Sequence, residues 1–156
     1  MPSSSPLGEN AVVLVDGSGY IFRAFHGLPM MNRPDCTPIN AVFGFTKMLM
    51  KLMQDLNPSY VAVIFDAGRT TFRNEIYPDY KANRSEPPEE LVPQFALVRE
   101  ATDALNLPMI EMAGYEADDI IASYAKLAAE AETDCLIVSS DKDLMQLVQP
   151  HVQMLD

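Results

Sequence analysis

The sequence predicts an α/β domain in which helices cover both faces of a central parallel sheet. Four short apolar runs are rich in β-branched and aliphatic residues, as strands buried on both faces are. The stretches between them are long enough for the crossover helices that parallel strands require. The runs are Ala11 to Val15, Val61 to Phe65, Met109 to Ala113 and Cys135 to Val138.

The stretch after the first run predicts a helix from Thr37 and Pro38 to about Leu56, because a threonine cap followed by proline is typical of a helix start. Its apolar residues recur at the spacing of a core-facing stripe: Ile39, Val42, Phe43, Leu49, Met50, Met53 and Leu56. We expect the methionines to belong to the core rather than to a binding groove. Further helices are expected over Glu89 to Leu105 and Glu116 to Ala131, and a short one just after Asp141.

Length and composition indicate one globular domain. The chain has 156 residues, of which 48% are hydrophobic, enough to bury a core. Residues 1–10 are polar and are expected to form a disordered tail, and 11–156 the domain. No export signal or membrane-spanning run is present in the sequence, and Cys135 is interpreted as a core residue rather than half of a disulfide. These features predict a cytoplasmic protein.

The net charge of −11 excludes a nucleic-acid binder held by bulk positive charge, so any contact with DNA must be local. A long segment from Ala67 to Pro88 offers such a patch, since it mixes basic and aromatic residues and lacks an obvious core face. Solvated charge is the simpler explanation of such a run, but the mixture is typical of single-strand binding. The candidates for DNA contact are Arg69, Arg73, Tyr77, Tyr80, Lys81 and Arg84.

Acidic residues follow each of the four apolar runs. They are Asp16, Asp66, the group Glu116, Asp118 and Asp119, and the pair Asp141 and Asp143. The carboxyl ends of parallel strands lie along one edge of a sheet, so we expect seven carboxylates to converge there. Helix capping also explains acids that open helices, but Asp16 and Asp66 are expected to have no helix directly after them.

So many like charges would raise one another's pKa values, and a bound cation would relieve the repulsion. Oxygen ligands favour Mg²⁺ or Mn²⁺. A zinc site is disfavoured because His26 and His151 are isolated and Cys36 and Cys135 lack ligand spacing.

Four sequence stretches together resemble the 5′ nuclease domain of bacterial DNA polymerase I, a 5′-3′ exonuclease domain related to flap endonucleases. They are LVDGSGYIFRAFHGLP (14–29), VIFDAGRTTFRNEIYPDYKANR (63–84), GYEADDIIA (114–122) and SSDKDLMQLV (139–148). The resemblance implies a PIN-like fold, in which the seven acids bind metal, with two ions in the complete domain. It also implies that Tyr77, Tyr80, Lys81 and Arg84 belong to a helical arch beside a 5′ single strand, with Lys81 and Arg84 at the scissile phosphate.

The resemblance implies DNA with a 5′ flap or an RNA primer as substrate and a nucleoid-associated protein. Arg23 is a further candidate for phosphate contact, with a surface role as its alternative. The family continues beyond the equivalent of Asp156 with an element that binds duplex DNA and with further aspartates, so this sequence is expected to be the N-terminal part of a longer chain with a polymerase domain. The natural start is expected at Met1.

The sequence is also compatible with other functions. A stand-alone flap endonuclease or a PIN-type ribonuclease would also place acids on strand ends, although the basic and aromatic segment argues against the ribonuclease. A haloacid dehalogenase phosphatase needs an Asp-x-Asp pair after the first strand, whereas Gly17 and Ser18 follow Asp16. A non-catalytic metal-binding or DNA-binding part of a larger protein is the alternative from another class.

Overall fold

A computed structural model describes residues 10–67 and 88–156, whose strands form one sheet. Over these residues the strand order is β3-β2-β1-β4-β5, and every neighbouring pair is parallel. The strands are β1 (Val12–Asp16), β2 (Tyr60–Ile64), β3 (Met109–Ile110), β4 (Cys135–Val138) and β5 (Val152–Leu155). The helices are α1 (Gly17–Gly27), α2 (Asn40–Leu56), α4 (Val92–Ala104), α5 (Ala117–Glu130) and the 3₁₀ helix η1 (Lys142–Leu147). The predicted parallel sheet is confirmed.

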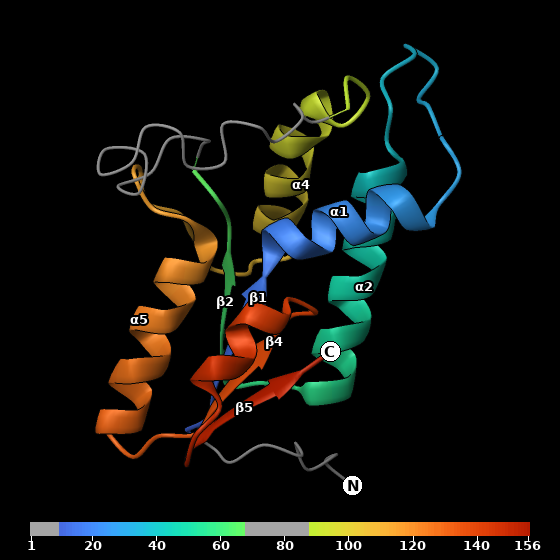
Figure 1. Cartoon of the computed structure of the whole chain (residues 1–156). Helices are drawn as coiled ribbons and strands as arrows, with labels where there is room; N and C mark the ends of the chain where they lie inside the picture. The colour runs from blue at the N-terminus through green and yellow to red at the C-terminus, as the bar shows by residue number, and fades with distance from the viewer. Residues whose placement is uncertain (1–9, 68–87) are drawn as a thin grey trace, which may run out of the picture.

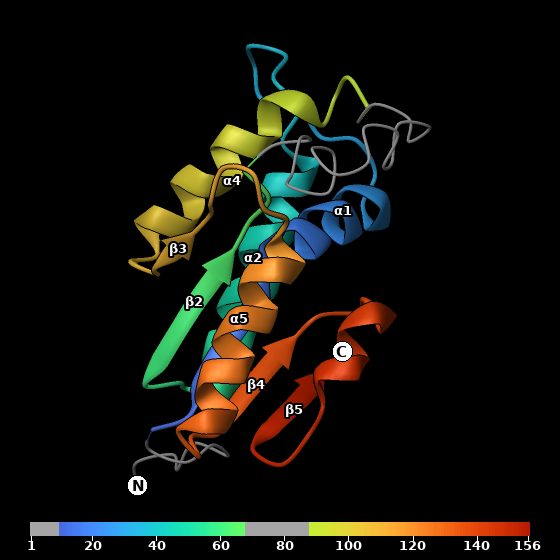
Figure 2. The same ribbon diagram turned by 60° about the vertical axis from the view of Figure 1, so that its left-hand side comes forward.

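Helices cover both faces of this sheet (Figures 1 and 2). Helices α1, α2 and α4 pack on one face, and α5 and η1 on the other. Successive side chains of a strand point to opposite faces, so Val13 and Val15 join the core beneath the first group of helices, whereas Leu14 joins the core beneath α5. All three are at most 1% exposed, which confirms strands buried on both faces.

The strand order creates a switch point between β1 and β4. From β1 the chain continues to β2 and β3 on one side, and then crosses back to β4 and β5 on the other. Open parallel sheets bind ligands outside the carboxyl ends of their strands at such a point. Helix α5 makes the crossover from β3 to β4 and begins at the same edge. The residues that end β1, follow β4 and open α5 are therefore brought to one place.

Helix α1 corrects the expectation that Asp16 has no helix after it. The helix begins at Gly17, and the Asp16 side chain caps it by accepting a hydrogen bond from the Gly19 backbone N–H. Two glycines in the first turn lower helix propensity and hid the helix in the sequence. Gly17 is required by packing, because a Cβ there would lie 2.6 Å from a ring carbon of Phe65 and 2.9 Å from the Ile64 carbonyl oxygen.

Helix α2 starts later than predicted, at Asn40 rather than at Thr37 and Pro38. Pro38 instead forms an antiparallel bridge with Asn32 in the loop between α1 and α2. The start of α2 is capped from another helix. The buried Gln94 side-chain oxygen accepts hydrogen bonds from the backbone N–H groups of Ala41 (2.7 Å) and Val42 (3.1 Å). The Gln94 amide also donates to the Asn40 side chain at 2.9 Å, which ties α4 to α2.

The predicted core stripe of α2 is partly wrong. Phe43 is 46% exposed and Met50 is 54% exposed, whereas Leu49 and Leu56 are buried and Met53 packs against the core. The buried residues of α2 are instead Asn40, Ala41, Gly44, Phe45, Leu49, Leu52 and Leu56. Gly44 allows α2 to approach α1, since a Cβ there would lie 2.9 Å from the Ala24 Cβ.

The remaining boundaries differ in detail. Helix α5 and the short helix after Asp141 are confirmed, the latter as a 3₁₀ helix, and α4 lies within its predicted range. Strand β3 ends at Ile110 rather than Ala113, because the last backbone bond of this pair joins Phe65 N–H to Ile110 O. Strand β5 was not predicted, and it adds a parallel edge strand beside β4.

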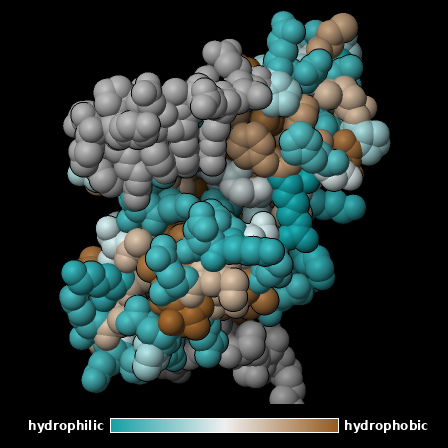
Figure 3. Space-filling view, viewed as in Figure 1, coloured by the Kyte–Doolittle hydropathy of each residue, from teal (hydrophilic) through white to brown (hydrophobic). Residues whose placement is uncertain are grey.

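The visible surface is mostly hydrophilic, with apolar atoms over α1 and near η1 and β5 (Figure 3). No helix among residues 10–67 and 88–156 is long and apolar enough to cross a membrane. Cys135 is buried, as predicted, and Cys36 is exposed. The predicted N-terminal tail lies almost wholly outside the described residues.

Candidate metal centre

Asp16 stands at the switch point with both carboxylate oxygens hydrogen-bonded. It ends β1 and is 5% exposed. Its Oδ1 accepts from Gly19 N at 3.0 Å and its Oδ2 accepts from Ser139 Oγ at 2.7 Å. Burial raises the pKa of Asp16, while these two hydrogen bonds oppose the rise. The carboxylate is thus held in one orientation, and each oxygen keeps lone-pair capacity for another partner.

Asp66 follows β2 and is anchored by its backbone and its side chain. Its side-chain Oδ1 accepts from Ala117 N, the first residue of α5, at 2.5 Å. Its backbone N–H donates to Ser18 Oγ at 3.0 Å, and its carbonyl oxygen accepts from Arg99 Nη2 at 2.9 Å. Three different helices therefore position this exposed aspartate.

Asp118, in the first turn of α5, has the most perturbed carboxyl group. Its pKa rises from 3.8 to about 7, first through burial and then through repulsion by Asp141 and Asp16. A hydrogen bond with the Asp141 side chain and the charge of Asp66 contribute in the same direction. The charges of Asp141, Asp16 and Asp66 all raise the pKa of Asp118, as neighbouring like charges do.

Asp141 caps η1, as its position in the sequence indicated. Its Oδ1 accepts from Asp143 N at 2.9 Å, and its own backbone N–H donates to Ser139 Oγ at 3.0 Å. Asp143 lies in the first turn of η1 and is exposed. Asp141 thus caps η1 and also interacts with Asp118.

Glu116 and Asp119 form a capping box at the start of α5. The Asp119 Oδ2 accepts from the Glu116 backbone N–H at 2.9 Å, an arrangement that stabilises helix N-termini. Glu116 and Asp119 therefore do have the helix-capping role that was the alternative to metal binding.

Four of the predicted acids interact electrostatically: Asp16, Asp66, Asp118 and Asp141. The other three lie close to them in sequence, at the starts of α5 and η1: Glu116, Asp119 and Asp143. Within the described part of the chain, no three acidic, histidine or cysteine side chains already stand at the spacing of a metal-ligand set. The donor chemistry fits a hard divalent cation, since the grouped donors are carboxylate oxygens that repel one another.

Only one of the predicted DNA contacts belongs to the described part of the chain. Arg69, Arg73, Tyr77, Tyr80, Lys81 and Arg84 lie outside the described residues. Arg23 is described: its Nη1 lies 3.7 Å from an Asp156 carboxylate oxygen, and both side chains are more than half exposed. This position on α1 is compatible with the surface role considered for it, and a phosphate contact there stays a prediction.

Three residues that support the acids were not predicted from the sequence: Ser18, Arg99 and Ser139. The two serines stand within the stretches LVDGSG and SSDKD, but nothing in their spacing reveals a hydrogen bond between distant segments. Arg99 lies over the Phe65 ring, 4.7 Å from its centroid, and is 3.2 Å from Glu111 Oε2. The partners of Arg99 lie at the ends of β2 and β3, so no local sequence pattern around Arg99 indicates its role.

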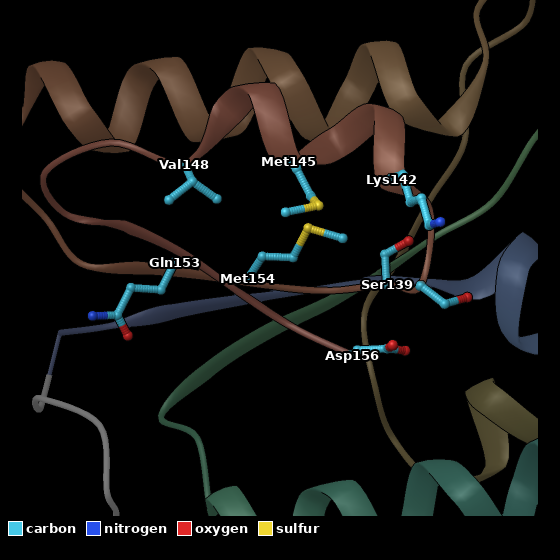
Figure 4. A pocket seen from close by; sticks show the side chains of 8 residues that line it. Ser139, Lys142, Met145, Val148, Gln153, Met154 and Asp156 are labelled. Atoms are coloured by element: carbon cyan, nitrogen blue, oxygen red, sulfur yellow. The ribbon is translucent and has the colours of Figure 1, made fainter.

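An open groove of about 610 Å³ lies between η1 and β5 (Figure 4). The Met145 and Met154 side chains approach each other within it. Its remaining lining comes from Ser139, Ser140, Lys142, Val148, Gln153 and Asp156. Since Asp16, Asp66, Asp118 and Asp141 do not line it, this groove is distinct from the acidic group.

The raised pKa of Asp118 predicts a pH-dependent stability of the metal-free chain. The folded state holds this proton up to about pH 7 and the unfolded chain only to about pH 4, so the stabilising contribution is fully present below about pH 4 and lost as the pH rises through about 7. Asp118→Asn removes it. Because Asp118 is partly solvated, screening leaves an effect of about 1 kcal/mol, or about 2–4 °C in Tm.

Thermal unfolding in chelator at about pH 5 and pH 8 measures this effect. The Tm of the wild-type chain should fall relative to that of Asp118→Asn as the pH rises. Parallel pH profiles for the two proteins would show that Asp118 titrates normally.

Comparison with known proteins yields a family match and close relatives. Residues 11–156 match the family described as "5′-3′ exonuclease, N-terminal resolvase-like domain". The chain is 60% identical over 151 residues to DNA polymerase I of Rhizobium leguminosarum, covering 92% of this chain and 15% of that protein. It is 41% identical over 152 residues to a 5′-3′ exonuclease of Bacillus subtilis (strain 168), covering 95% of this chain and 51% of that one.

The fold also matches a solved structure of T5 5′-exonuclease with bound divalent metal ions, which are zinc in that crystal. The TM-score is 0.69 at 25% identity, and the match covers 92% of this chain and 54% of the T5 chain. The chain thus spans about half of the T5 protein and of the Bacillus exonuclease, and a smaller share of the polymerase.

Proposed function

The chain belongs to the 5′-3′ exonuclease N-terminal domain family, and from that premise we propose that it supplies the metal-binding part of a divalent-metal-dependent 5′ nuclease. The substrate is DNA with a 5′ flap or an RNA primer, which the enzyme shortens by hydrolysing phosphodiester bonds during replication and repair. The observation that carries the proposal is the group formed by Asp16, Asp66, Asp118 and Asp141 at the switch point of the sheet. The cytoplasm, in association with the nucleoid, is the proposed location.

The natural protein is proposed to be a DNA polymerase I, in which a duplex-binding element and a polymerase domain follow. High identity to the Rhizobium polymerase supports this assignment. The match to the Bacillus exonuclease favours a second candidate, a shorter protein with nuclease activity alone. Both candidates use the same acidic group and the same reaction.

The proposed cofactor is Mg²⁺ or Mn²⁺, with two ions in the complete domain, because all the proposed ligands are carboxylates. The grouped aspartates would hold the ions with help from Glu116, Asp119 and Asp143. When bound, such ions lower the pKa of water and stabilise the leaving oxygen. A divalent metal is supported by the T5 structure, whose zinc ions do not decide the metal here.

The chain's own side chains have separable tasks in this proposal. The hydrogen bonds from Gly19 and Ala117 orient Asp16 and Asp66 before metal arrives, which lowers the cost of organising the site. Lys81 and Arg84 would contact the scissile phosphate and offset its charge. Arg69, Arg73, Tyr77 and Tyr80 would bind the single strand through phosphate contacts and stacking, with Arg23 as a further phosphate contact.

Cleavage of a labelled 5′-flap substrate tests the function. We expect the natural protein containing this chain to release the flap in Mg²⁺ and to stop when chelator is added. A fully single-stranded RNA serves as the control substrate, since preferential cutting of that RNA would favour a PIN-type ribonuclease. Metal-independent cutting, or no cutting of either substrate, would contradict the proposal.

A further inference from the structure

Ser139 is a buried hydroxyl that joins two strand ends at the switch point. It follows β4 directly and is 2% exposed. Its Oγ donates to Asp16 Oδ2 at 2.7 Å and accepts from the Asp141 backbone N–H at 3.0 Å. A single side-chain atom therefore links an acid at the end of β1 to the segment that carries another acid after β4.

The backbone of Ser139 is also fixed. Its N–H donates to the Leu155 carbonyl oxygen at 3.0 Å, next to the ladder between β4 and β5. The hydroxyl consequently projects from a rigid point of the sheet rather than from a loose loop. Because it is almost fully buried, water cannot easily replace the bonds that it makes.

This geometry leaves Asp16 few orientations. Its Oδ1 is bound by the start of α1 and its Oδ2 by Ser139. If the hydroxyl is removed, Oδ2 loses its donor and the Asp141 N–H loses its acceptor at the same time. The carboxylate of Asp16 can then rotate, and the start of η1 is held less firmly relative to β1.

We propose that Ser139 is a positioning residue, which orients Asp16 and fixes the spacing between Asp16 and Asp141 for cation binding. The inference rests on the proposed function, because it takes the acidic group to be the metal site. Ser139 itself is not a metal ligand in this proposal. It acts through the acids, as hydrogen-bonding partners of metal ligands generally do.

Binding of Mn²⁺ to the natural protein that contains this chain, measured by titration calorimetry, tests the proposal without relying on cleavage. Ser139→Ala should weaken Mn²⁺ binding by about 10- to 100-fold, the usual effect of removing such a partner. Ser139→Thr keeps the hydroxyl and should recover most of the affinity. Ser140→Ala is the matched control, since the neighbouring serine is exposed and its loss should leave the affinity unchanged.

The folded state of each variant is compared by its near-UV circular dichroism and its Tm without metal. Should Ser139→Ala not fold, Ser139→Cys replaces it, because a thiol fits a similar space but is a weak hydrogen-bond partner. A folded Ser139→Ala or Ser139→Cys protein that binds Mn²⁺ as tightly as the wild type would overturn the proposal. Equal weakening by Ser140→Ala would overturn it too, since the effect would then not belong to the buried hydroxyl.

Asp16→Asn separates this proposal from the one on which it rests. If Asp16→Asn loses Mn²⁺ binding while Ser139→Ala retains it, the metal site stands and the role of Ser139 is wrong. If the wild-type protein and Asp16→Asn bind Mn²⁺ equally, or neither binds it, the acidic group is not the metal site and both proposals fail. In the natural protein, the Mn²⁺ concentration for half-maximal cleavage should rise in Ser139→Ala, and the rate should recover at high Mn²⁺.

Discussion

If the proposed function holds, Asp66→Asn or Asp118→Asn in the natural protein is expected to lower single-turnover flap cleavage on the order of 10³-fold, with the fold unchanged. Loss of one charged ligand removes several kcal/mol of charge stabilisation by the metal, and each 1.36 kcal/mol corresponds to a tenfold change in rate. Asparagine preserves the size of the side chain. At position 66 it also keeps an oxygen that can accept the hydrogen bond from Ala117 N.

Asp55→Asn provides a matched control for these two variants. Asp55 is an exposed residue of α2, paired with Lys51 at 3.3 Å, and exposed ion pairs of this kind contribute little to stability. Its cleavage rate should equal that of the wild type. A folded Asp66→Asn or Asp118→Asn protein with wild-type turnover would remove that residue from the metal site.

Much of the fold was predictable because parallel strands buried on both faces leave a strong signal. Runs such as Cys135 to Val138 are apolar without interruption, and β4 occupies that range. Elements without such a signal were missed or displaced. Helix α1 is masked by two glycines, of which Gly17 is required by its packing against Phe65. The start of α2 depends on Gln94, which lies more than 50 positions away.

The candidate site was predictable to a similar degree. An acid at the end of each strand run locates the sheet edge, and the structure brings Asp16, Asp66 and Asp118 within electrostatic reach of one another. The supporting contacts were not predictable. The hydrogen bond from Ser139 to Asp16 spans 123 positions, and no local pattern encodes a partner at that distance.

The acidic group would repel DNA, and the basic residues between Arg69 and Arg84 would offset this repulsion. DNA phosphates approaching four interacting carboxyl groups would be repelled, and the whole chain carries a net charge of −11. Between Arg69 and Arg84 the sequence has four basic and two acidic residues, a local excess of positive charge. This contrast leads us to propose that Lys81 and Arg84 bring the phosphate to the metals.

Lys81→Ala and Arg84→Ala, tested in the natural protein, should therefore each reduce flap cleavage by about 10²- to 10³-fold, the range for loss of one group that stabilises transition-state charge. Each should also reduce the slope of log affinity against log salt by about 0.7–0.9, because one phosphate contact fewer releases fewer counterions. Binding is measured in Ca²⁺ over a series of salt concentrations, and cleavage in Mg²⁺.

Lys51→Ala is the control for both measurements, since Lys51 is an exposed cation on α2 whose described partner is Asp55. Removing it changes the net charge by the same amount as Lys81→Ala, so a general electrostatic effect on DNA binding would appear equally in both variants. If Lys81 and Arg84 contact phosphates directly, only Lys81→Ala and Arg84→Ala should reduce the slope of log affinity against log salt. Equal slopes in all four proteins, with unchanged cleavage, would place Lys81 and Arg84 away from the DNA and leave the phosphate to be held by other residues.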